Sequence, residues 1–118
     1  MISIISTLYN SGFYIDEFYN RIKKLIYEID EDYELIFVND GSMDNSWARV
    51  EALSISDSKI VGVDLSRNFG HHYAIWAGLE AAKGDKVFLI DCDLEEPPEL
   101  LLNFHKLFKE NANVDFLD

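Results

Sequence analysis

The chain has 118 residues, of which 48% are hydrophobic, and its 22 acidic and 10 basic residues give a formal net charge of −12. This length and composition indicate one globular domain with a buried core and exclude a disordered or fibrous chain. The negative charge argues against nucleic acid as a partner, and no run of about 18 apolar residues is present to cross a bilayer.

The first half of the chain predicts a strand, an amphipathic helix and a second strand. The apolar run 2–8 is typical of a buried strand, and a second such run covers 34–38. Between them, apolar residues recur at steps of three and four with charged residues among them, which predicts a helix with one buried face. That face consists of Ile15, Phe18, Ile22, Leu25 and Ile29.

The second half continues the alternation of helices and strands. Asp44 is placed to cap a helix that precedes a third strand at 60–65. The next helix, predicted over 71–83, is rich in alanine and glycine, which allow a helix to lie close to a sheet. A fourth strand is predicted at 86–90.

The end of the chain predicts one more helix and one more strand. Pro97 and Pro98 suit the first turn of a helix, and 114–117 indicates the opening of a fifth strand. The last helix carries apolar residues on more than one face, so we expect something beyond residue 118 to cover part of it. These apolar residues are Leu100, Leu101, Leu102, Phe104, Leu107 and Phe108.

Strands that alternate with helices, each strand an unbroken apolar run, predict an α/β fold with a parallel sheet covered on both faces. In such sheets, ligands bind beyond the carboxyl ends of the strands. Every predicted strand ends in polar residues, so all four strands supply polar groups to one edge. The polar segments at that edge are 7–10, 39–42, 66–70 and 91–93.

Acidic residues are concentrated after the fourth strand, where Asp91 and Asp93 are followed by Glu95 and Glu96. Like charges this close are unfavourable unless a cation lies among them. A site with few carboxylate ligands suits Mg²⁺ or Mn²⁺, which keep water and substrate phosphate as further ligands. The alternative is a solvated acidic loop that stabilises the start of the following helix.

Four residues at the other strand ends are candidates for contact with a nucleotide. Asp40 can accept hydrogen bonds from a base or ribose, or can belong to an ordinary Asp-Gly turn. Arg67 suits a diphosphate or a base carbonyl, or can pair with nearby aspartates. Tyr9 can stack on a base while Thr7 donates a hydrogen bond, with core filling as the alternative.

The histidines and the cysteine near this edge are given no catalytic role. His71 and His72 are adjacent and point in different directions on a helix, so we expect residues of the first helical turn and not ligands of one metal. Cys92 is expected to be a small buried thiol, and as the single cysteine it excludes an internal disulfide and suits a reducing compartment. Residues 1–6 have no basic leader or cleavage signal, so we expect no signal peptide.

Four motifs in order, which together cover most of the chain, resemble the family 2 glycosyltransferases. The resemblance is closest to the branch that includes dolichol-phosphate mannose synthases and bacterial polyprenyl-phosphate sugar transferases. The matching segments are VNDGSxDxS at 38–46, LSRNFGH at 65–71, AxxAGLxxAxGD at 74–85 and DxDLxxPPE at 91–99.

The resemblance implies a truncated nucleotide-diphospho-sugar transferase fold (GT-A, Rossmann-like), a three-layer α/β sandwich with a mainly parallel sheet. It implies a metal-dependent hexosyltransferase that uses a UDP- or GDP-sugar, Mg²⁺ or Mn²⁺, and a polyprenyl phosphate or polysaccharide precursor as acceptor. By motif position, Asp91 and Asp93 are the catalytic and metal-binding residues, with Glu95 as a further metal ligand. The implied nucleotide-binding residues are Thr7, Tyr9, Asp40, Arg67 and Asp91.

The chain departs from the family pattern in three respects. Thr7 stands where a proline is usual, and Ser11 where an acidic residue is usual, which affects the shape of the first loop. Glu95 replaces a common glutamine, which should tighten metal binding and also repel the diphosphate. The third departure is length: we expect residues 1–118 to form a single nucleotide-sugar-binding domain without the acceptor-binding C-terminal part, and to bind donor weakly and transfer sugar poorly alone.

This reading predicts a cytoplasmic location, or the cytoplasmic face of a membrane reached through the missing part. An uncovered strand edge also allows pairing into a homo-oligomer. One alternative is a non-catalytic nucleotide-binding or interaction module derived from a truncated transferase. Another is a haloacid-dehalogenase-like phosphatase, which places the same acidic pair after its first strand and normally has threonine or valine where Glu95 stands.

Overall fold

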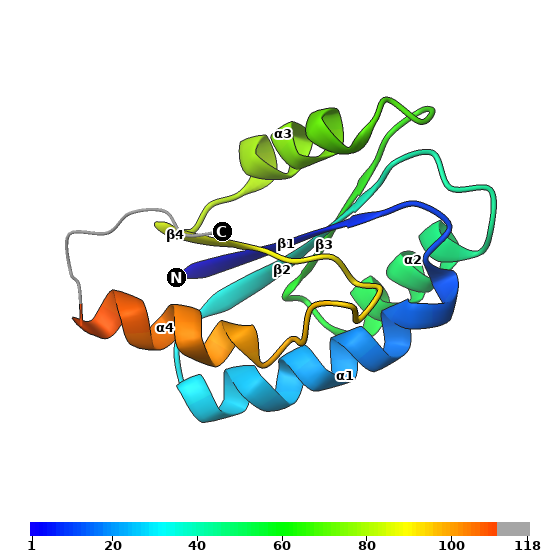
Figure 1. Cartoon of the computed structure of the whole chain (residues 1–118). Helices are drawn as coiled ribbons and strands as arrows, with labels where there is room; N and C mark the ends of the chain where they lie inside the picture. The colour runs from blue at the N-terminus through cyan, green and yellow to red at the C-terminus, as the bar shows by residue number, and fades with distance from the viewer. Residues whose placement is uncertain (111–118) are drawn as a thin grey trace.

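The computed structural model describes residues 1–110 as a parallel four-stranded sheet with helices on both faces (Figure 1). The sheet order is β3-β2-β1-β4, which confirms the predicted α/β class. The strand predicted at 114–117 lies outside the described residues. The elements are β1 (Ile2–Leu8), α1 (Gly12–Ile29), β2 (Tyr33–Asn39), α2 (Ser46–Ser56), β3 (Ile60–Asp64), α3 (His71–Ala81), β4 (Lys86–Leu89) and α4 (Leu100–Glu110).

The larger core lies between the sheet and the layer formed by α1, α2 and α4 (Figure 1). Alternate residues of β1 point into it, and Ile2, Ile4 and Leu8 are completely buried there. The apolar stripe predicted for the first helix is buried in α1, which confirms the helical period. Within residues 1–110, none of the helices combines the length and hydropathy that a bilayer-crossing span requires.

Helix α3 covers the opposite face of the sheet (Figure 1), and small residues let it lie close. Ala74 and Gly78 are buried against β1 and β2. A Cβ added to Gly78 would lie 2.6 Å from Ile5 Cγ2 and 3.2 Å from Val38 Cγ2. The close approach expected from the alanine and glycine content is therefore confirmed.

The C-terminal end of α3 is set by hydrogen bonds to two polar side chains of the sheet, Glu34 of β2 and Ser3 of β1. The buried carboxylate of Glu34 accepts hydrogen bonds from the Lys83 N–H and the Ser3 hydroxyl, both at 2.6 Å. The Gly84 N–H donates to Ser3 Oγ at 2.8 Å. Because these bonds draw the backbone toward the sheet, the helix ends at Ala81 and not at Lys83 as predicted.

Helix α4 begins later than the sequence predicted. Its first residue is Leu100, so Pro97 and Pro98 precede the helix, and the N–H of Leu100 closes a tight turn on the Pro97 carbonyl at 3.0 Å. Leu100 and Leu107 are exposed, as expected for a helix with apolar residues on more than one face. The buried residues of α4 are Leu101, Phe104 and Phe108.

Asp44 joins the N-termini of α1 and α2. Its Oδ2 accepts the Gly12 N–H at 2.9 Å, and its Oδ1 accepts the Ser46 N–H at 3.0 Å and the Ser46 hydroxyl at 2.6 Å. The N-cap position of α2 is Asn45, one residue after the predicted Asp44, but the Asp44 carboxylate still accepts the first N–H of α2 and also serves α1. Burial alone would raise the pKa of Asp44, but these hydrogen bonds outweigh it and lower the pKa below its ordinary value.

We predict that Gly78→Ala destabilises the protein despite the better helix propensity of alanine. The helix gains about 1 kcal/mol from the substitution, whereas overpacking against Ile5 costs about 1–3 kcal/mol. Urea denaturation should therefore show a net loss of about 1 kcal/mol. In an Ile5→Ala background the clash with Ile5 is absent and only the milder contact with Val38 remains, so Gly78→Ala should cost clearly less; an equal loss in both backgrounds would refute the packing explanation.

We predict that Asp44→Ala costs about 1 kcal/mol at neutral pH, the usual value of a helix cap. The folded pKa of Asp44 lies below its unfolded value, so this stabilisation is complete above the unfolded pKa and disappears as the pH falls through the folded pKa. Urea denaturation from pH 6 to about pH 3 should show the difference between wild type and variant shrinking. Asp44→Asn keeps one acceptor oxygen and should lose less; a pH-independent difference would contradict the assignment.

Candidate functional site

The carboxyl ends of the four strands meet at one edge of the sheet. Leu8 of β1 pairs with Asn39 of β2, and Asn39 pairs with Asp64 of β3, so these three strands end level with one another. In β4, Leu89 pairs with Ile5. Continuing that register brings the residues after β4 beside the end of β1. The predicted polar edge is therefore formed.

A first cavity at this edge, the Arg67 cavity, has a volume of about 590 Å³. It lies between the ends of β1, β2 and β3. Tyr9 is exposed beside it, so its ring is free to stack on a ligand. The side chains that give the cavity its character are Tyr9, Asn39, Ser42, Trp47, Asp64 and Arg67.

Arg67 is a cation without a carboxylate partner. Among residues 1–110, no carboxylate oxygen lies within 4.0 Å of its guanidinium, although the chain has 22 acidic residues. The guanidinium carbon instead lies 4.4 Å from the centroid of the Phe69 ring. The alternative of pairing with nearby aspartates is therefore not seen, and Arg67 lines the cavity without an ion-pair partner among residues 1–110, although Asp64 lines the same cavity.

Asp40 is buried, at 4% exposure, and holds the loop that carries Arg67. Its Oδ1 accepts the Phe69 N–H at 2.8 Å, and its own N–H donates to the Leu8 carbonyl at 2.8 Å. Gly41 follows with a positive φ of 68°, and a Cβ there would overlap the backbone of Asn68. Asp40 thus ties the end of β2 to the β3–α3 loop.

A smaller cavity of about 270 Å³ adjoins Asp40 between the end of β1 and the start of α3. Thr7, Tyr9 and His71 also line it. The sequence-predicted residues Thr7, Tyr9 and Asp40 are therefore brought together around one hollow. Contact of these residues with a nucleotide stays a prediction.

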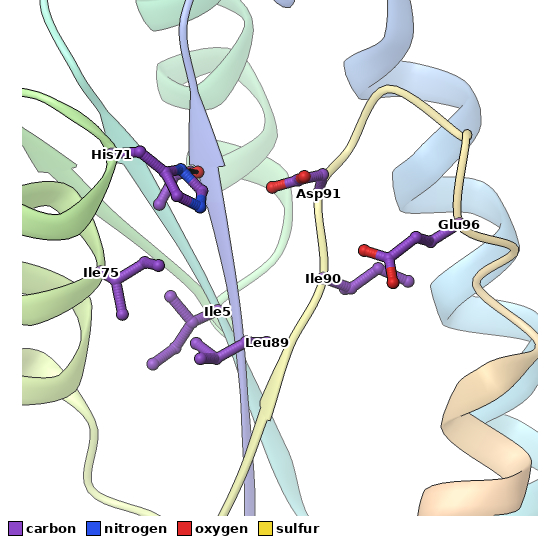
Figure 2. Close-up of a pocket in the computed structure, with 8 residues that line it drawn as sticks. Ile5, His71, Ile75, Leu89, Ile90, Asp91 and Glu96 are labelled. Carbon is purple, nitrogen blue, oxygen red and sulfur yellow. Dashed lines mark hydrogen bonds between the residues drawn. The ribbon is translucent and has the colours of Figure 1, made fainter. Parts of the chain in front are cut away.

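A third cavity, the His71 cavity, has a volume of about 260 Å³ and lies between α3, β1 and the segment after β4. Figure 2 shows His71 and Asp91 pointing toward one another across it. His71 Nδ1 lies 3.2 Å from Thr7 Oγ1, which fixes the ring. Glu96 adds a second carboxylate, and the floor is apolar, formed by Ile5, Ile75, Leu89 and Ile90.

Asp93 and Glu95 do not line the His71 cavity with Asp91. Residues 92–93 form a turn, so the side-chain alternation of a strand does not apply there, and Asp93 Oδ1 accepts the Glu95 N–H at 3.1 Å. In the described part of the chain, no group of three or more His, Cys, Asp or Glu side chains is arranged to hold a metal ion. Metal binding by Asp91, Asp93 and Glu95 therefore stays a prediction.

Cys92 is buried at the same turn, as predicted. Burial raises the pKa of its thiol to about 11, so the group is protonated at neutral pH and is not a nucleophile.

His71 is the site residue that sequence reasoning missed. His71 and His72 do lie in the first turn of α3, as expected, and both are exposed, but only His71 lines the two cavities. The available signal was its position directly after the polar segment 66–70, at the carboxyl edge of the sheet. A residue that starts a helix at this edge faces the same space as the strand ends.

Comparison with known proteins agrees with this geometry. The sequence profile of the family described as Glycosyl transferase family 2 matches residues 3–117. The uncharacterized glycosyltransferase YkcC of Bacillus subtilis (strain 168) is 43% identical over 112 residues, which are 95% of this chain and 35% of that protein. An undecaprenyl-phosphate 4-deoxy-4-formamido-L-arabinose transferase of Aeromonas hydrophila is 39% identical over 100 residues, 84% of this chain and 31% of that protein.

Solved structures show the same fold. Staphylococcus aureus TarS 1-349 in complex with UDP-GlcNAc has a TM-score of 0.77 and 27% identity, covering 94% of this chain and 32% of that one. The mannosyltransferase PcManGT from Pyrobaculum calidifontis, in complex with GDP-Man and Mn²⁺, has a TM-score of 0.76 at 24% identity, covering 90% and 32%. The GT-A fold implied by the sequence motifs is thereby confirmed.

The chain spans about a third of the length of the relatives that it matches. Within that span, the match is nearly continuous, since it runs over residues 3–117 for the family profile. The motif positions, the sheet order and the relatives all indicate the same family. The chain belongs to glycosyltransferase family 2.

Proposed function

We propose that the chain is the nucleotide-sugar-binding part of a glycosyltransferase that takes a sugar from a UDP- or GDP-sugar. The observation that carries the proposal is the gathering of an unpaired cation, a buried carboxylate and an acidic segment at one sheet edge, with cavities between them. A structure of 27% identity that contains UDP-GlcNAc supports the donor class. The family membership supports the reaction class.

The Arg67 cavity is the proposed nucleotide site. Its volume of about 590 Å³ lies within the range of small-molecule sites. Tyr9, which lines both this cavity and the smaller one beside it, stacks on the base. Asp40 lines only the smaller cavity, and from there it accepts a hydrogen bond from base or ribose with the carboxylate oxygen that Phe69 does not use. Arg67 supplies the positive charge that a diphosphate needs in a chain of net charge −12.

The acidic segment after β4 is the proposed metal site. Mg²⁺ and Mn²⁺ are often bound through one or two carboxylates plus substrate phosphates, so Asp91 and Asp93 are sufficient protein ligands, with Glu95 as a third. Their hard oxygen atoms fit these cations. Asp91 and Asp93 would hold the cation where negative charge develops on the leaving diphosphate, and the cation would supply neutralisation of that charge.

The proposed acceptor is a polyprenyl phosphate. A relative of 39% identity is named for transfer to undecaprenyl phosphate, which supports this class. Such a phosphate is already ionised, so attack on the anomeric carbon needs little proton abstraction, and a strong general base is not required of residues 1–110. The lipid acceptor would place the reaction at the cytoplasmic face of a membrane.

We predict that Mn²⁺ strengthens binding of UDP or GDP to the chain roughly tenfold, because Asp91 and Asp93 would hold the cation and the cation would attract the diphosphate. Isothermal titration with each nucleotide, with and without Mn²⁺, measures this. Asp93→Asn should lose the Mn²⁺-dependent part and keep the metal-free binding. Glu28→Gln on the exposed face of α1 is the matched control; Mn²⁺ dependence that is absent in wild type, or unchanged in Asp93→Asn, would exclude this metal site.

We predict that His71→Ala weakens binding of the nucleotide sugar more than binding of the nucleotide. The His71 cavity lies beside Asp91, where the sugar would follow the diphosphate, and loss of one hydrogen bond there corresponds to roughly a fivefold weaker affinity. The adjacent and exposed His72→Ala is the control. Equal losses for UDP-GlcNAc and UDP, or for GDP-mannose and GDP, would place His71 outside the sugar site.

A further inference from the structure

Three planar groups stack in series beside the Arg67 cavity. The guanidinium carbon of Arg67 lies 4.4 Å from the centroid of the Phe69 ring. The Phe69 ring in turn lies 4.7 Å from the Tyr73 ring, with an interplanar angle of 24°. We call these three residues the Arg67 stack. It extends from the β3–α3 loop to the first turn of α3.

The base of the stack is fixed by the backbone. The Phe69 N–H donates to the buried Oδ1 of Asp40, and the backbone at Asn68 packs directly on Gly41. Phe69 therefore cannot move far from the end of β2. Tyr73 lies four residues later, inside α3, so its position is fixed by the helix. The backbone of Phe69 is thus held by Asp40, its ring stacks with Tyr73, and Arg67 lies over the same ring.

Stacking holds an arginine in a different way from an ion pair. A free arginine side chain carries about 2 kcal/mol of rotamer entropy, which a ligand must overcome when it orders the side chain. A carboxylate partner would also order Arg67, but it would occupy N–H donors and neutralise the charge. An aromatic face attracts the guanidinium through its ring quadrupole and leaves the N–H groups at the edge of the plane. No hydrogen bond occupies these donors among residues 1–110.

The exposure of the Phe69 and Tyr73 rings argues against a role in packing the core. Tyr73 is 50% exposed and Phe69 also lies at the surface, so neither ring contributes much to the core. Trp76 lies one turn further along α3 and is 60% exposed, with no ring contact to Tyr73 within residues 1–110. The stack thus includes only the two rings that continue the line from Arg67.

We propose that Phe69 and Tyr73 are positioning residues that hold Arg67 ready for the diphosphate or base of the donor nucleotide. This inference rests on the proposed function. Preorganisation lowers the entropy lost on binding, so the two rings increase affinity without touching the ligand. Tyr73 acts through Phe69, and Phe69 acts through Arg67. The effect of either ring should therefore depend on the presence of Arg67.

The test is a double-mutant cycle on the 118-residue chain, with UDP and GDP as the ligands in isothermal titration. Phe69→Leu and Tyr73→Leu should weaken binding of the preferred nucleotide roughly two- to fivefold, and Trp76→Leu, the matched control, should leave it unchanged. In an Arg67→Ala background, Tyr73→Leu should have no further effect. A purely structural role of Tyr73 would cause the same loss in both backgrounds and would overturn the inference.

A second measurement follows the arginine without a ligand. The ¹⁵N relaxation of the Arg67 Nε–H group should report a lower order parameter in Tyr73→Leu than in wild type or Trp76→Leu. An unchanged order parameter overturns the inference. If the wild-type chain binds neither nucleotide, the proposed function and the inference both fail. If nucleotide binds but is insensitive to Tyr73→Leu, only the inference fails.

Discussion

The parallel pairing of β1 with both β2 and β4 is the constraint on which the site depends. Parallel strands require a crossover, and each crossover returns the chain so that all strands end at the same edge. Four segments that are far apart in sequence therefore meet there, and Asp40 of the second segment bonds to Leu8 of the first and to Phe69 of the third. Ile5 shows how the sheet interior supports this edge, because it pairs with Leu89 and also receives the close packing of Gly78. The α3 helix can then start directly beside the strand ends.

Sequence reasoning predicted the sheet edge well because its elements are decided by local pattern. The apolar runs of the strands and the stripe of α1 need only periodicity, and the structure has both at the expected places. Element ends were less accurate where a distant group decides them. Glu34 and Ser3 end α3 through hydrogen bonds that no pattern within 71–83 reveals. The late start of α4 has a local cause, the tight turn that follows Pro97.

In the candidate site, too, the features set by residue type and position could be predicted, whereas those set by backbone geometry could not. Asp40 and Arg67 were predicted to lie at this edge, and do so, because their residue types and positions at strand ends are informative by themselves. The direction of a side chain depends on backbone geometry, which the residue pattern does not determine, so the directions of His71 and Asp93 were not predicted. His71 faces the cavity because α3 begins at that point, and Asp93 turns to the Glu95 N–H because the backbone leaves the strand before it. Neither outcome follows from residue spacing.

The charge distribution links the two halves of the proposed donor site. In a chain with net charge −12, an anionic ligand is favoured only where the local field differs from the overall field. Arg67 provides one such place at the end of β3, since no carboxylate within residues 1–110 pairs with it and the Phe69 ring, itself stacked on Tyr73, lies against it. The segment after β4 has the opposite character and needs a cation before it can accept a phosphate. A nucleotide sugar with a divalent cation would match the charge of both Arg67 and the acidic segment after β4, whereas a free anion would match only Arg67. If Asp91 and Asp93 bind the proposed metal, it would determine selectivity for a diphosphate as well as its reactivity.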